Sequence, residues 1–332
     1  MIKINDNKIF KKSLNDFPIS YEKLCKCYSN FTAQFEFHRS PIDSQFWGLL
    51  EKKSLIDAEK EINNNYSKWL ETLRQRHFYM SSTSFYRSFQ LFLAYLTLDK
   101  YKYKTWGDVT GYYSRFYFIQ AFLNLLQCSL IFVKSDIKMK NNKDRNFIIY
   151  NSGDKFVFLN LNKSKLFSEA SGSHQKWWRL FQELDKLEDY KIENIDFILS
   201  DGYFNPVKRN KVNYSHDYLE GFIELEWFDT GLTNMMAHFN MQHTRSDRDI
   251  TDIDRFFKGY DPEFSDEGDF YGDEAQIMWC SIKVYLQLLN SLPIKQDFIA
   301  LDKLEALSRE HIQSIFPNIH SGIVESCREI LD

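Results

Sequence analysis

The stretch FYFIQAFLNLLQCSLIFV, residues 116–133, carries no charged side chain. Its 18 residues reach the lower limit of length for a helix that crosses a membrane. Gln120, Asn124 and Gln127 interrupt it at spacings close to one helical turn, so a helix would bring them to one partly polar face. We therefore expect a buried core helix over about 109–133, and a membrane span is the alternative.

The sequence around this stretch predicts further helices. The chain has 332 residues with only 12 Gly and 6 Pro, and so few breakers favour long helices over a sandwich or barrel with many tight turns. The sequence SSTS at 81–84 is typical of a helix start. The spacing of apolar residues predicts helices at 56–73, 85–98, 109–133, 173–187, 214–241 and 274–292, and one or two more in the last 35 residues.

A short β element interrupts this helical pattern. FIIY at 147–150 and FVFLNL at 156–161 flank the turn sequence NSGD at 151–154, which predicts a β-hairpin. Residues 131–139 can add a third strand. The expected fold class is mainly α, a helical bundle with a small β-hairpin insertion at about 131–162.

The helices suggest two regions. Residues 1–80 are expected to form an N-terminal accessory helical region, and 81–332 a helical domain that carries the β insertion and an acidic loop at about 247–273. The five cysteines are odd in number and match no disulfide framework, and the N-terminus lacks the apolar core of a signal peptide. A reduced, cytoplasmic compartment is the prediction.

Charge and motifs exclude several classes of function. The net charge of −4 gives no overall basic field, so any contact with nucleic acid needs a local patch. The chain has no GxxxxGK[ST], GxGxxG or GxSxG motif, which removes most ATPase, kinase and hydrolase readings. The acidic loop does not fit the spacing of a calcium loop, and His238 and His243 are five residues apart, too far for a metal pair on one helix face. We expect no metal and no cofactor.

After these exclusions, the sequence KRNKVNYSH, residues 208–216, is the remaining arrangement of side chains that could carry out catalysis. Arg209 stays charged and binds phosphate oxygens, whereas His216 titrates near neutral pH and can act as acid or base. His216 lies in the first turn of the predicted helix at 214–241, where backbone N–H groups favour an anion. Such a pair suits metal-free RNA cleavage, and a symmetric dimer would supply one histidine as base and another as acid.

This segment resembles the signature of the HEPN superfamily, in which Arg is followed by four to six residues and then His, with a polar residue just after the Arg. Arg209, Asn210 and His216 match those positions, and the Tyr-rich stretch GYYSRFYFIQAFLNLL at 111–126 resembles an early helix of the superfamily's bundle. The resemblance covers about 85–292. The β insertion departs from the minimal bundle of that superfamily.

The resemblance implies a helical, dimeric, metal-independent endoribonuclease of a toxin–antitoxin or anti-phage defence system. Arg209 and His216 would be catalytic and Asn210 would orient the site, with Lys208, Lys211 and Tyr214 supporting the RNA substrate. Two alternatives stay open. One is a catalytically inactive HEPN-like binding, scaffold or sensor subunit with a protein partner, and the other is an ordinary basic loop before a helix.

Overall fold

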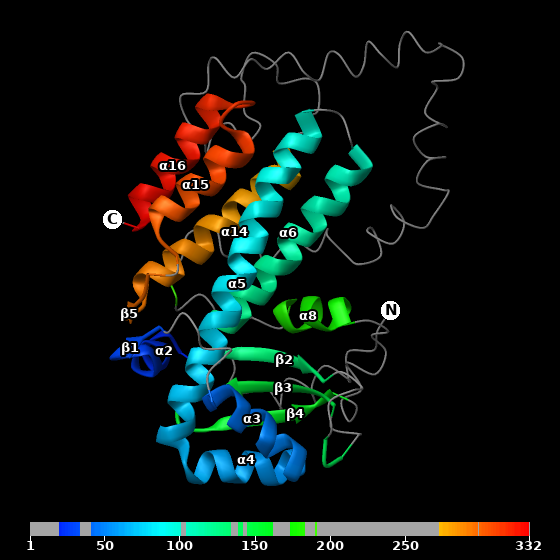
Figure 1. Ribbon diagram of the computed structural model, residues 1–332, viewed down its shortest axis with the longest axis vertical. Helices are drawn as coiled ribbons and strands as arrows, with labels where there is room; N and C mark the ends of the chain where they lie inside the picture. Colours follow the sequence, from blue (N-terminus) through cyan, green and yellow to red (C-terminus); the bar gives the residue numbers. More distant parts are fainter. Residues whose placement is uncertain are drawn as a thin grey trace, which may run out of the picture. The chain divides into compact units, whose positions relative to one another are not determined.

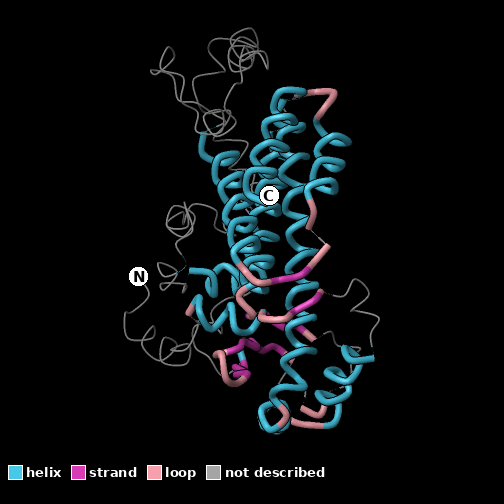
Figure 2. Tube along the Cα trace, turned by 90° about the vertical axis from the view of Figure 1, so that its left-hand side faces the viewer, coloured by secondary structure: helices cyan, strands magenta, loops and turns pink. Residues whose placement is uncertain are grey.

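Helices dominate the described part of the chain, and the strands are short (Figures 1 and 2). The computed structural model describes residues 20–33, 41–100, 104–133, 139–141, 145–161, 173–182, 190, 272–297 and 299–331. The helices in these residues are α2 (Tyr21–Tyr28), α3 (Pro41–Lys52), α4 (Leu55–Asn64), α5 (Tyr66–Lys100), α6 (Lys104–Leu125), α8 (Ser173–Gln182), α14 (Gly272–Ser291), α15 (Leu301–Ile312) and α16 (Pro317–Leu331). The strands are β1 (Phe31–Thr32), β2 (Cys128–Phe132), β3 (Asn146–Asn151), β4 (Phe156–Asn160) and β5 (Ile294–Lys295). The predicted mainly helical class with a small β element is confirmed.

The chain divides into two compact units. The first takes its described residues from 1–85, 118–195 and 287–298, and the second takes them from 86–117, 196–286 and 299–332. Residue 80, the expected end of an accessory region, lies inside α5. The first unit thus joins helices from before that residue to the β insertion after it.

Helix α5 is continuous where a break was predicted. The expected helices at 56–73 and 85–98 are instead α4 and the longer α5, and the sequence SSTS lies inside α5 rather than at a helix start. The Ser81 hydroxyl donates to the Ala121 carbonyl of α6 at 2.7 Å, and the Thr83 hydroxyl donates to the Tyr79 carbonyl one turn earlier at 2.8 Å. Because these hydroxyls are used within and between helices, they do not cap a helix end.

The uncharged stretch at 116–133 ends as a strand. Helix α6 stops at Leu125, and the expected helix as far as residue 133 is wrong over its last part. Gln127 adopts a left-handed backbone with φ 60°, which ends the helical path before β2 begins. No helix within the described residues combines the length and the apolar character that a membrane span requires.

Strands β2, β3 and β4 form an antiparallel sheet in chain order, and the predicted hairpin is confirmed as β3 and β4. The added strand, expected at 131–139, is β2 at Cys128–Phe132 and begins three residues earlier than predicted. Cys128 pairs with Tyr150 and Asn151 pairs with Phe156 in the two ladders. One face of the sheet joins a buried cluster with α3, α4 and α5, and α4 packs against β4 (Figure 1). The members of this cluster are Phe46, Leu49, Leu50, Leu55, Ala58, Ile62, Trp69, Leu73, Ile131, Val133, Phe147, Ile149, Phe156 and Phe158.

Further predicted helices are confirmed, one in the middle of the chain and the others toward its C-terminal part. The range 274–292 is α14, the last 35 residues contain α15 and α16, and the helix predicted from residue 173 is α8 as far as Gln182. In the second unit the ring of Phe92 stacks on Trp279 of α14 with centroids 6.0 Å apart. Helices α15 and α16 pack against each other as a hairpin (Figure 1).

The turn between β3 and β4 depends on Gly153. Its φ is +101°, a conformation that side chains with a Cβ rarely adopt, and its N–H donates to Oδ1 of Asn151 at 2.8 Å. A Cβ at this position would lie 2.7 Å from Cδ of Lys23. Both the backbone conformation and the neighbouring Lys23 side chain therefore favour glycine at this position.

We predict that Gly153→Ala lowers the free energy of unfolding by about 1–2 kcal/mol, because the left-handed backbone disfavours a Cβ. Gly48→Ala is the matched control, since a Cβ at Gly48 of α3 meets nothing within 4 Å. In a helix interior that change is expected to be neutral or to stabilise by up to about 1 kcal/mol. Chemical denaturation of both variants measures the difference, and equal stability of Gly153→Ala and the wild type would contradict the turn assignment.

Candidate functional site

The predicted ribonuclease site lies outside the described residues. Lys208, Arg209, Asn210, Lys211, Tyr214 and His216 all fall within 191–271. The predicted helix at 214–241, the histidines His238 and His243, and the acidic loop as far as residue 271 fall in the same range. The proximity of Arg209 to His216 therefore stays a prediction.

A buried amide joins four segments of the first unit. The Nδ2 group of Asn151 donates to Oε1 of Gln127 and to Sγ of Cys27, each at 3.3 Å. Its Oδ1 accepts from the hydroxyl of Tyr66 at 3.1 Å and from the N–H of Gly153 at 2.8 Å. All four hydrogen-bonding positions of the amide are thus used. The cluster connects α2, the start of α5, the turn after α6 and the hairpin turn.

The thiols in the described core are poor nucleophiles. Burial raises the pKa of Cys27, although the nearby charge of Arg74 acts in the opposite direction. Burial also raises the pKa of Cys128 well above its usual value and that of Cys327 to about 12. Because the thiolate is the reactive form, these cysteines pack as small neutral groups near neutral pH.

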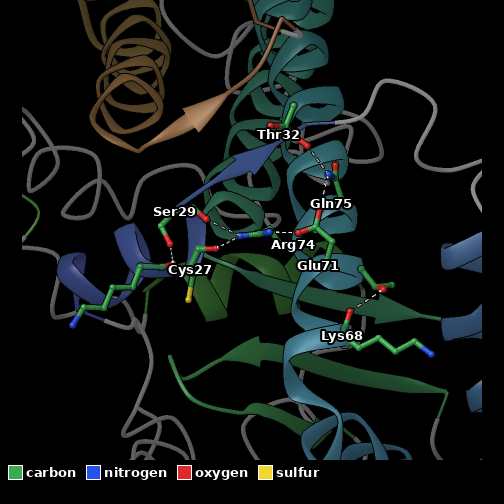
Figure 3. A network of polar contacts seen from close by, with 9 residues as sticks. Cys27, Ser29, Thr32, Lys68, Glu71, Arg74 and Gln75 are labelled. Atoms are coloured by element: carbon green, nitrogen blue, oxygen red, sulfur yellow. Dashed lines mark hydrogen bonds and ion pairs between the residues drawn. The ribbon is translucent and has the colours of Figure 1, made fainter.

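Arg74 of α5 fastens the end of α2 to the long helix (Figure 3). Its Nη1 donates to the carbonyl of Cys27 at 2.8 Å and to that of Ser29 at 3.3 Å, and its guanidinium also pairs with Glu71. Its charge lies 4.9 Å from the centre of the Phe31 ring. These contacts satisfy carbonyls that the end of a helix leaves without partners, so the arrangement is structural.

A serine and a histidine meet between α15 and α16. Nδ1 of His320 lies 2.9 Å from Oγ of Ser308. Ser308 is fully buried, and burial lowers the pKa of His320. A substrate has no access to that hydroxyl, so the pair is a polar contact that fixes the register of two helices rather than a nucleophile with its base. Within the described residues, no group of three or more His, Cys, Asp or Glu side chains could hold a metal ion.

His77 of α5 is a buried histidine without hydrogen bonds to other described residues. Its side chain is 0% exposed, and neither ring nitrogen has a partner. Burial lowers its pKa to about 3, and the positive charge of Arg76 adds to that effect. The ring is therefore neutral near neutral pH, which excludes it from acid–base chemistry there.

An open basic hollow lies at the surface of the first unit. It has a volume of about 440 Å³ and is lined by the end of α3, residues along the whole length of α4 and one residue of the segment between β2 and β3. The lining residues are Lys52, Lys53, Ser54, Asp57, Lys60, Glu61, Asn64 and Lys140. Four lysines against two carboxylates give this hollow a net charge of +2, opposite in sign to that of the whole chain.

The sequence contains only part of the signal for this hollow. Lys52 and Lys53 are adjacent, and Lys60 lies in the helix predicted from residue 56, which is an ordinary charge pattern for a solvated surface. Lys140 is far away in the sequence and is brought to α3 by its backbone N–H, which donates to the Leu50 carbonyl at 3.3 Å. The sequence alone does not reveal this long-range contact, and without it the hollow cannot be predicted.

No protein-family model, curated protein or solved structure was found to match the chain.

We predict that the stability of the wild type falls faster than that of His77→Leu when the pH decreases from 6.5 toward about 5. The folded pKa is about 3 and the ordinary value is 6.5, so only the unfolded state takes up the proton between them. One such proton costs up to about 1.4 kcal/mol per pH unit. Denaturant titrations at several pH values measure the slope.

The partly exposed His311 of α15 supplies the control variant, His311→Leu. It shows whether a change of slope is specific to the buried position of His77 or follows from removing any histidine. An identical slope in His77→Leu and in the wild type would show that His77 is not held neutral by burial.

Proposed function

We propose that this protein is a metal-independent endoribonuclease of a toxin–antitoxin or anti-phage defence system, acting in the cytoplasm as a HEPN-like homodimer. The observation that carries the proposal is the sequence of 208–216, in which Arg209 and the polar Asn210 precede His216 at the start of a predicted helix. The mainly helical fold is consistent with a helical bundle.

The reactive side chains described above are unsuited to catalysis, which directs the proposal to residues 208–216. Cys27, Cys128 and Cys327 are buried thiols with raised pKa values. His77 is a neutral buried ring, and Ser308 is inaccessible beside His320. None of these groups has the exposure and protonation state that catalysis requires.

The proposed reaction uses the ribose of the substrate as its own nucleophile. One His216 removes the proton from a 2′-hydroxyl, and the 2′-oxygen then forms a bond to the adjacent phosphorus. The bond from phosphorus to the 5′-oxygen breaks, and that oxygen takes a proton from the His216 of the second copy. Arg209 stabilises the charge of the five-coordinate phosphorane. The products are a 2′,3′-cyclic phosphate and a 5′-hydroxyl.

The supporting residues have separate roles in this proposal. Lys208 and Lys211 flank Arg209 and add positive charge for the phosphates of the substrate. Asn210 orients the reacting groups, and Tyr214 stacks on a base or anchors the helix. A partner protein such as an antitoxin would keep the activity silent in the cell.

We predict that the purified protein cleaves single-stranded RNA in the presence of EDTA. His216→Ala and Arg209→Ala are each expected to lower the rate constant of cleavage by about 10²–10⁴-fold, the range for removing a general acid–base group or a charge partner of the transition state. Gel analysis of labelled RNA measures the rate. His311→Ala, which removes a histidine of α15, is the control and should keep the wild-type rate.

Full cleavage by His216→Ala would rule out the proposed mechanism. Binding of RNA without cleavage by the wild type would favour the catalytically inactive, HEPN-like binding or scaffold protein instead.

A further inference from the structure

We propose that the basic hollow between α3, α4 and Lys140 binds the phosphate backbone of single-stranded RNA. This inference rests on the proposed function, since it assigns a second contact to the same substrate, away in the sequence from Arg209 and His216. A chain with a net charge of −4 needs such a local basic surface to hold a polyanion.

Some charged side chains of the hollow take part in ion pairs or hydrogen bonds within the protein, and others do not. Lys53 forms an ion pair with Glu61, and Asp57 accepts a hydrogen bond of 2.6 Å from the Ser54 hydroxyl. The amines of Lys52, Lys60 and Lys140 have no ion pair or hydrogen bond with any other described residue, and all three side chains are exposed. Three lysines thus border one hollow without an ion pair among the described residues, and together with the Asp57 carboxylate they give it its net charge of +2.

The N-terminus of α4 is not itself the binding group. Ser54 caps this helix, and its Oγ accepts from the N–H of Asp57 at 3.3 Å. The Asp57 carboxylate lies in the first helical turn, where it offsets the positive end of the helix dipole. The attraction for an anion therefore comes from the lysine side chains.

The lining predicts the kind of recognition. It contains no arginine and no aromatic side chain, so it has neither a bidentate fork for a fixed phosphate geometry nor a platform for stacked bases. Lysine ammonium groups on flexible stems act as point charges that tolerate many phosphate positions. Such a surface attracts the backbone independently of base sequence.

The size and openness of the hollow favour a flexible strand. Its volume of about 440 Å³ corresponds to roughly fifteen water molecules at ~30 Å³ each, which is more than one hydrated phosphate needs. A single strand can place successive phosphates in such a depression.

The test compares two triple variants of the full chain that lose the same charge. The first variant removes the three lysine amines of the hollow that form no ion pair or hydrogen bond with other described residues: Lys52→Gln/Lys60→Gln/Lys140→Gln. Lys68→Gln/Lys155→Gln/Lys295→Gln removes three exposed lysines that do not line it. Both triples are made in a His216→Ala background, so that binding is measured without cleavage, and thermal unfolding confirms that each protein is folded.

Fluorescence anisotropy with labelled oligo(A) and oligo(U) RNA gives the dissociation constant at several salt concentrations. For the hollow triple we expect at least fivefold weaker binding at low salt, and a salt-dependence slope smaller by about 2, because each neutralised phosphate of a single strand contributes about 0.7. The control triple should bind within about twofold of its parent, and both RNAs should behave alike.

Equal RNA binding by the two triples would overturn the inference, and so would the absence of RNA binding by the parent. Loss of binding to an acidic peptide such as oligoglutamate, with RNA binding unchanged, would reassign the hollow to a protein partner. Binding and cleavage are separate readouts. If the two triples bind RNA equally, while the protein with an intact His216 cleaves RNA, only this inference is contradicted. Binding that is retained in a protein that never cleaves RNA contradicts only the proposed function.

Discussion

The buried amide of Asn151 is the interaction on which the described first unit depends. It bonds at once to Cys27 of α2, Tyr66 at the start of α5, Gln127 after α6 and Gly153 in the hairpin turn. The chain conformations at two of these positions are unusual, with positive φ at Gln127 and at Gly153. An amide that uses all its donors and acceptors in a buried site fixes these positions together, because leaving any one of them unpaired costs free energy.

Local patterns could be predicted from the sequence because neighbouring residues determine them. Apolar runs on both sides of the turn sequence at 151–154 specify the hairpin, and the apolar run at 274–292 specifies α14. The end of α6 could not be predicted in this way. The apolar residues after Leu125 suit a helix or a strand equally well, and the choice is made by pairing with β3 from residue 146 onward.

The false break in α5 has a similar origin. A serine- and threonine-rich sequence is typical of a helix start, but Ser81 finds its acceptor on α6, which no local pattern reveals. The basic hollow also depends on a distant contact, that of Lys140 with α3. The chemistry of residues 208–216, by contrast, can be proposed from the sequence alone because residue types and spacing carry it, and its geometry lies outside the described residues.

The proposed activity and the hollow divide the work of a ribonuclease between two parts of the sequence. Arg209 and His216 would stabilise the charge of the transition state and transfer protons. Lys52, Lys60 and Lys140 would bind the RNA backbone despite the net negative charge of the protein.

The end groups of cleaved RNA test the central claim most directly. Mass spectrometry should find 2′,3′-cyclic phosphate and 5′-hydroxyl ends, and none from a substrate with 2′-deoxyribose at the cleavage position. Fragments with 5′-phosphate and 3′-hydroxyl ends would contradict the account.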